Sequence, residues 1–99
     1  MACKVTVSPT ALQELSDIVG YLSEVSVPAA KTFMASFTEV LDNIGSELVE
    51  YRMARIPKLA SQGYRTALFD RYVLLYKKEG GVAYIAHVFH QSRNYAKLV

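Results

Sequence analysis

Hydrophobic and polar residues alternate with two different periods along this chain, and the period changes near the middle. In residues 11–22 and 30–44 the apolar side chains recur every three or four positions, which predicts two amphipathic helices. From residue 64 onward the period shortens to two, or the segment becomes apolar throughout, as expected of β-strands. The chain therefore divides into a helical first half and a sheet-forming second half.

Short signals mark where the two helices begin and end. Ser8-Pro9 and Ser26-Val27-Pro28 precede the apolar runs. Serine caps the first free N–H groups of a helix, and proline fits its first turn. Gly45 can end the second helix in a left-handed conformation. Because few residues separate the two helices, we expect an antiparallel helix hairpin.

Four strands complete the predicted fold. The segments with strand character are residues 3–7, 64–69, 72–77 and 82–90. Asp70-Arg71 and the glycine-containing residues 78–81 can join the last three strands as an antiparallel meander. Residues 46–62, interrupted by a proline, predict an irregular loop with a short turn of helix. The order β-α-α-β-β-β predicts an α+β fold in one domain, residues 1–99, with the hairpin packed on a mainly antiparallel four-stranded sheet.

Composition narrows the cellular setting. The 99 residues are 52% hydrophobic, enough for a modest core without metal ions or disulfides. No apolar run reaches the length of about 18 residues that a transmembrane helix needs, and the N-terminus resembles no secretory signal. The single cysteine, Cys3, cannot form an internal disulfide, and a small buried side chain is a better interpretation of it than a reactive thiol. These features predict a cytoplasmic protein.

Charge is distributed unevenly, although the net charge is only +2. Residues 1–50 hold two lysines and seven acidic residues, a net charge of −5, whereas residues 51–99 hold nine Lys or Arg and two acids, a net charge of +7. The second half can therefore build a basic surface for phosphates or an acidic partner. The alternative is that the two halves neutralise each other in the fold. The candidate residues for such a surface are Arg55, Lys58, Arg65 and Arg71.

The segment 82–95, VAYIAHVFHQSRNY, is the strongest candidate for a functional site. Its first part is apolar on both sides and predicts a central strand, and a rigid strand can aim the polar residues that follow it. His90 can act as an acid or base, Arg93 can bind phosphate, and Tyr95 can donate a proton or stack on a base. The alternative is that these residues only brace the C-terminus.

His87 is expected on the opposite face of this strand, with Ile85 and Phe89, as a core histidine. Neither carboxylates nor cysteines accompany the two histidines in the sequence, so no zinc site is expected. No other metal ion or cofactor is predicted.

Four features occur together and in one order along the chain. They are VTVSPTALQELSDIVGYL at residues 5–22, Ala29-Ala30 with Phe33, GYRTALFDRYVLLYKKEGGVAYIAHVFH at residues 63–90, and HQSRNY at residues 90–95. In this combination the chain resembles the RelE/ParE superfamily of toxins from bacterial type II toxin–antitoxin systems, the plasmid stabilisation family. The ending is similar to the family's His-x-x-Arg-Asp/Asn-Tyr pattern.

The resemblance implies a toxin that a cognate antitoxin holds inactive by wrapping it with a helical or extended segment. It is compatible with a homodimer or a toxin–antitoxin hetero-oligomer, and it implies no membrane partner. The superfamily divides by target. RelE-like members cleave messenger RNA on the ribosome without a metal ion, whereas ParE-like members poison DNA gyrase and are not nucleases.

RelE-like nucleases carry two arginines that this chain lacks at the matching positions. The first falls on the strand that here reads YVLLY, at Val73, with Arg71 two residues earlier, and the second falls at Gln91. The resemblance therefore favours a ParE-like toxin that inhibits growth by poisoning DNA gyrase. There are two alternatives. One is a RelE-like endoribonuclease that acts through the C-terminal residues named above, and the other is a degenerate module that only binds its antitoxin.

Overall fold

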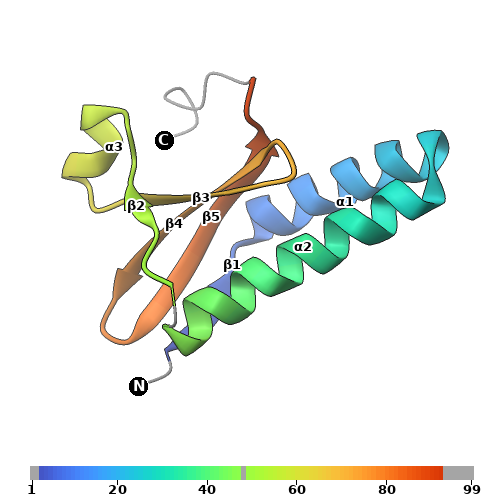
Figure 1. Ribbon diagram of the computed structural model, residues 1–99. Coiled ribbons are helices and arrows are strands. Elements are labelled where there is room, and N and C mark those ends of the chain that lie inside the picture. The colour runs from blue at the N-terminus through green and yellow to red at the C-terminus, as the bar shows by residue number, and fades with distance from the viewer. Residues whose placement is uncertain (1–2, 48, 93–99) are drawn as a thin grey trace.

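The computed structural model describes residues 3–47 and 49–92 (Figure 1). A hairpin of two long helices lies across one face of a five-stranded sheet, and a short third helix packs on the other face. The predicted α+β class and helix hairpin are confirmed. In chain order the elements are β1 (Lys4–Val7), α1 (Pro9–Val25), α2 (Val27–Ser46), β2 (Arg52–Met53), α3 (Pro57–Ser61), β3 (Arg65–Phe69), β4 (Tyr72–Glu79) and β5 (Val82–His90).

Both long helices begin at the predicted serine caps. Ser8 Oγ accepts the Ala11 N–H at 3.0 Å, and Ser26 Oγ accepts the Ala29 N–H at 3.3 Å. The backbone N–H of Ser26 also donates to the Leu22 carbonyl at 2.7 Å, so this one residue ends α1 and caps α2. The hairpin is tight for that reason. Among the helices of the described residues, none has the length and apolar content required to cross a membrane.

Gly45 does not end α2, contrary to the prediction. The helix continues to Ser46, and Glu47 takes the left-handed conformation with φ of 60°. Gly45 instead lets the helix approach β1 closely, because a Cβ atom there would lie 3.3 Å from Val5 Cγ2. The Gly45 carbonyl also accepts the Cys3 N–H at 2.7 Å. The glycine therefore serves packing between α2 and β1.

The sheet has the order β1-β5-β4-β3-β2. β1 runs parallel to β5, and the other neighbours are antiparallel. β5 has a strand on each side, as its apolar pattern predicted. The prediction of four strands is wrong by one, because Arg52 and Met53 pair with Thr66 and Arg65. This added strand is two residues long and exposed, so it carries no hydrophobic alternation that the sequence could reveal.

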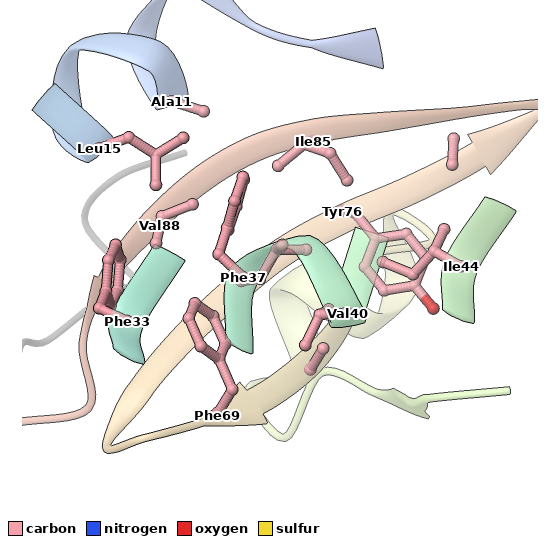
Figure 2. Close-up of a cluster of buried hydrophobic side chains, with 13 residues drawn as sticks. Ala11, Leu15, Phe33, Phe37, Val40, Ile44, Phe69, Tyr76, Ile85 and Val88 are labelled. Atoms are coloured by element: carbon pink, nitrogen blue, oxygen red, sulfur yellow. The ribbon is translucent and has the colours of Figure 1, made fainter. Parts of the chain in front are cut away.

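Two apolar clusters lie on opposite faces of the sheet. Under the helices, four residues of α2 meet aromatic and aliphatic side chains of β3, β4 and β5 (Figure 2). The Phe33 ring lies 5.5 Å from that of Phe69 and 4.8 Å from that of Tyr72. The second cluster lies on the α3 side and comprises Ala54, Leu59, Val73, Leu75 and Phe89, with Ile56 and Tyr64 packed against it.

In β5 the side chains alternate between the two faces of the sheet, and this alternation shifts by one residue midway along the strand. The pairing of β4 with β5 slips by one residue at Ala86, which forms a β-bulge. Ile85 before the bulge and Val88 after it both pack under the helices, whereas Phe89 packs on the α3 side. The predicted placement of His87 with Ile85 and Phe89 on one face is therefore wrong, because strict alternation stops at the bulge.

Candidate functional site

His90 ends β5 with an exposed imidazole, as predicted. Its Nδ1 accepts the backbone N–H of Ser92 at 3.2 Å and lies 2.8 Å from Ser92 Oγ. The ring meets the paired Tyr72 edge-on, with centroids 5.4 Å apart. Because Nδ1 is an acceptor here, a neutral ring carries its proton on Nε2. His90 is thus held in one orientation at the end of a rigid strand.

The other two members of the predicted C-terminal set, Arg93 and Tyr95, lie outside the described residues. The predicted convergence of His90 with Arg93 and Tyr95 is therefore untested and remains a prediction.

The four predicted basic residues do not form one cluster. Arg65 is partly buried, and its guanidinium donates to the Tyr51 carbonyl at 2.6 Å and pairs with Glu50 at 3.2 Å. These contacts tie β3 to the preceding loop. Lys58 is exposed on α3 and has an interaction partner of its own.

Arg71 lies in the turn between β3 and β4. Asp70 and Arg71 have φ angles of 46° and 70°, as in the type I′ turns that join two antiparallel strands with two residues. The Arg71 carbonyl accepts the Gln91 N–H at 2.9 Å. The turn therefore brings Arg71 beside the chain that leaves β5.

Arg55 lines two neighbouring hollows on the α3 side of the sheet. The first, here called the Val73 hollow, has a volume of about 160 Å³ and is lined by Arg55, Thr66, Leu68, Val73 and Gln91. The second, the Arg52 hollow, has a volume of about 430 Å³. Its lining comprises Glu50, Tyr51, Arg52, Met53, Arg55, Thr66 and Leu68.

Val73 and Gln91, the two positions that the resemblance matched to arginines of RelE-like nucleases, both line the Val73 hollow. Val73 is 3% exposed and belongs to the α3-side cluster, while Gln91 contributes a neutral carboxamide. Among the described residues that line this hollow, only Arg55 is charged.

The two halves of the chain neutralise each other only in part. Lys78 pairs with Glu47 at 3.2 Å, and Arg65 pairs with Glu50 at the same distance. Within residues 3–47 and 49–92, the side chains of Arg52, Arg55 and Arg71 have neither an acidic partner nor a hydrogen bond. These three arginines are exposed cationic groups of the second half of the chain.

A third hollow separates α1 from the end of the sheet. It has a volume of about 410 Å³, and His90, Tyr72, Tyr21 and Ile18 line it together with Glu14 and Asp17. Burial raises the pKa of the Tyr72 phenol, and the nearby Tyr21 raises it further. Tyr72 is therefore a neutral hydrogen-bonding group at physiological pH. This side of His90 is apolar and acidic, which is unsuitable for an RNA phosphate.

One polar cluster was missed by the sequence-based prediction. Glu14 Oε2 lies 3.2 Å from His87 Nδ1, and Glu14 Oε1 accepts the Val88 N–H at 3.0 Å. The expectation that no carboxylate accompanies the histidines is wrong for His87. A histidine inside an apolar strand needs a polar partner, which was the available signal. No group of three or more His, Cys, Asp or Glu side chains in the described part of the chain could hold a metal ion.

Comparison with known proteins identifies the family. Residues 5–95 match the family described as the ParE toxin of the type II toxin–antitoxin system parDE. A solved structure of the chromosomal ParDE system from P. aeruginosa contains a similar chain, with a TM-score of 0.71 and 14% sequence identity over 90% of this chain and 96% of that one. No curated protein matches the chain in sequence. Because the family match spans nearly its whole length, the chain belongs to the ParE toxin family of type II toxin–antitoxin systems.

Proposed function

We propose that this ParE toxin inhibits growth by binding and poisoning DNA gyrase, and that it does not cleave RNA. A cognate antitoxin encoded beside it neutralises the toxin in the cytoplasm. Membership of the ParE family supports the mode of action, and the Val73 hollow supports the absence of nuclease chemistry.

The observation that carries the proposal is the composition of that hollow. Cleavage of RNA without a metal ion needs cations that stabilise the crowded phosphate. At the two positions where a RelE-like nuclease would supply guanidinium groups, this chain supplies a buried isopropyl group at Val73 and a neutral amide at Gln91. Arg55 is the one charged side chain among the described residues lining it. A single exposed arginine is a weak substitute for two placed on rigid strands.

The proposed antitoxin is supported by the surface of the chain as well as by its family. A structurally similar chain comes from the chromosomal ParDE system of P. aeruginosa. Arg52, Arg55 and Arg71 have no acidic partner within the described residues, and Leu68 is 63% exposed. Exposed apolar and unpaired cationic groups together suit a protein partner with acidic residues.

A plasmid cleavage assay tests the gyrase proposal. Purified toxin is added to gyrase and supercoiled plasmid, and cleaved plasmid is expected to accumulate in proportion to the toxin. The same preparation is added to translating ribosomes, where the messenger RNA is expected to stay intact. Unaffected gyrase together with loss of ribosome-bound message would reverse the assignment in favour of an endoribonuclease.

The endoribonuclease is the second candidate because of His90. Its exposed ring is oriented by Ser92 and Tyr72, with Nδ1 acting as an acceptor, and an imidazole so held can transfer a proton. A toxin that affects neither gyrase nor message but binds its antitoxin would instead be a degenerate binding module.

A further inference from the structure

One side of α1 carries apolar residues that the core does not bury. Ile18, Tyr21 and Val25 recur at spacings of three and four residues, so they share one side of the helix. Tyr21 is 65% exposed and Val25 is 67% exposed. Val25 is the last residue of α1, and the tip of the helix hairpin extends past the end of the sheet (Figure 1). This exposed strip of α1 is therefore available to a partner.

The strip adjoins the hollow of about 410 Å³ between α1 and the end of the sheet, here called the Tyr21 hollow. Tyr21 and Ile18 line it on α1, and Tyr72 lines it on β4. Glu14 accepts the Val88 N–H at 3.0 Å, which fixes α1 to β5 at this hollow. The hollow is thus formed before a partner arrives, and its aromatic lining is typical of a binding site.

Two carboxylates beside the Tyr21 hollow lack cationic partners. Asp17 lines the hollow, and Glu24 lies about two helical turns further along the same side of α1. Neither forms an ion pair with a described residue, and Asp17 accepts the neutral carboxamide of Gln13 at 2.9 Å. Among the described residues that line the hollow there is no Lys or Arg. The cations that would complement these acids must therefore come from a partner.

The combination of tyrosines with an unpaired carboxylate suits the side chain of an arginine or a lysine. The face of a tyrosine ring attracts a cation, and a carboxylate accepts charge-assisted hydrogen bonds from a guanidinium or ammonium group. Proteins that handle DNA display such side chains, because they must neutralise phosphates. DNA gyrase, the target in the proposed function, is an enzyme of that kind.

We propose that the Tyr21 hollow and the adjoining strip of α1 bind a basic surface of DNA gyrase, with an arginine or lysine of gyrase contacting the Tyr21 ring and the Asp17 carboxylate. The inference rests on the proposed function, because gyrase is the target named there. A nucleic acid is disfavoured, since the carboxylates repel phosphates. Acidic side chains of an antitoxin are repelled for the same reason. Two copies of the toxin joined through this face would bring their acidic hollows together, which is also unfavourable.

Charge reversal at Asp17 tests the inference in the plasmid cleavage assay with intact gyrase. Asp17→Lys should raise the toxin concentration needed for half-maximal cleavage by about tenfold or more, because a cation then faces the cations of gyrase. Asp42→Lys is the control, since it makes the same change of charge at an exposed position of α2 outside the lining of the hollow. It should alter that concentration by less than about twofold.

Removal of the Tyr21 ring provides a second test that leaves the charge unchanged. Tyr21→Ala should weaken gyrase poisoning by about tenfold. Leu12→Ala is its control, because Leu12 is 56% exposed on the same helix but does not line the hollow. Thermal unfolding and affinity for the antitoxin are measured for all four variants and should match those of the wild type. Added salt should weaken poisoning by the wild type more than poisoning by Asp17→Lys.

The outcomes separate this inference from the proposed function. If the wild type poisons gyrase and the Asp17 and Tyr21 variants do so equally well, the inference is overturned and the gyrase target stands. If the wild type leaves gyrase unaffected, both are overturned. Loss of antitoxin affinity in these two variants would assign the hollow to the antitoxin instead. Self-association of the wild type that these variants abolish would assign it to a second copy, and either result overturns the inference.

Discussion

Glu14 accepts the backbone N–H of Val88 at 3.0 Å, although 74 residues separate them in sequence. β1 stops at Val7, so no strand of the described chain lies beside Val88 on that side of β5. The carboxylate from α1 takes the place of the missing strand. The other oxygen of Glu14 lies 3.2 Å from His87 Nδ1. The first helix is thereby attached to the bulged part of the last strand.

Removal of this carboxylate should destabilise the fold. Glu14→Ala leaves the Val88 N–H and the partly buried His87 ring without their partner, which should lower the free energy of unfolding by about 1.5–3 kcal/mol. Glu24→Ala is the control, because Glu24 is an exposed carboxylate near the other end of the same helix. Chemical denaturation measures both, and equal losses in the two variants would contradict the role assigned to Glu14.

Two helical glycines should respond oppositely to enlargement. A Cβ atom added at Gly20 would have no neighbouring atom within 4 Å, so Gly20→Ala should stabilise α1 by about 0.5–1 kcal/mol through its better helix propensity. At Gly45 a Cβ would meet Val5 Cγ2 at 3.3 Å. Gly45→Val should therefore destabilise the protein by about 1–3 kcal/mol. Thermal unfolding of the two variants compares them, and stabilisation by Gly45→Val would disprove the close packing of α2 on β1.

Stability should fall in alkaline solution because of Tyr76. Burial raises the pKa of this phenol above its ordinary value of 10.0, so the folded protein holds the proton more tightly than the unfolded chain. The resulting stability is fully present below pH 10 and is lost as the pH rises through the folded-state pKa. Between pH 9 and about 11 the wild type should lose more unfolding free energy than Tyr76→Phe. Parallel pH profiles of the two proteins would contradict this assignment.

Replacement of His90 should distinguish binding from catalysis. If the toxin acts by binding gyrase, His90→Ala should retain killing within about threefold, because no proton is transferred. A general acid or base at this position would instead lose on the order of 10²-fold or more. Growth inhibition after induction measures the effect, and Ser92→Ala is a matched control that removes only the hydroxyl beside Nδ1.

The helices and the meander could be predicted because their signals are local. Serine–proline caps, periodic apolar residues and the short links at residues 70–71 and 78–81 each specify structure within a few positions. The register of β1 on β5 and the fifth strand depend on contacts between distant segments. Arg52 and Met53 form a strand only because Thr66 and Arg65 lie beside them, and no pattern within β2 itself indicates this.

The site was less predictable than the fold. His90 was placed correctly at the strand end, whereas Arg65 proved to hold the loop before β2 in place. The link between Glu14 and His87 depends on a bulge, which shifts side chains by one position and leaves no periodic trace. The Val73 hollow forms where β3, β4, the loop before α3 and the residue after β5 meet, so only the folded chain shows that Val73 and Gln91 share it.

The parallel pairing of β1 with β5 has a consequence for biosynthesis. Lys4–Val7 emerges from the ribosome first among the strands, but its only neighbour in the described sheet is Val82–His90, which emerges last. Until then β1 has no strand to pair with, and the helix hairpin has no completed sheet to pack on. Closure of so long a loop is a slow step in folding. The toxin should consequently mature after translation, which gives a co-produced antitoxin time to reach it before its surface is complete.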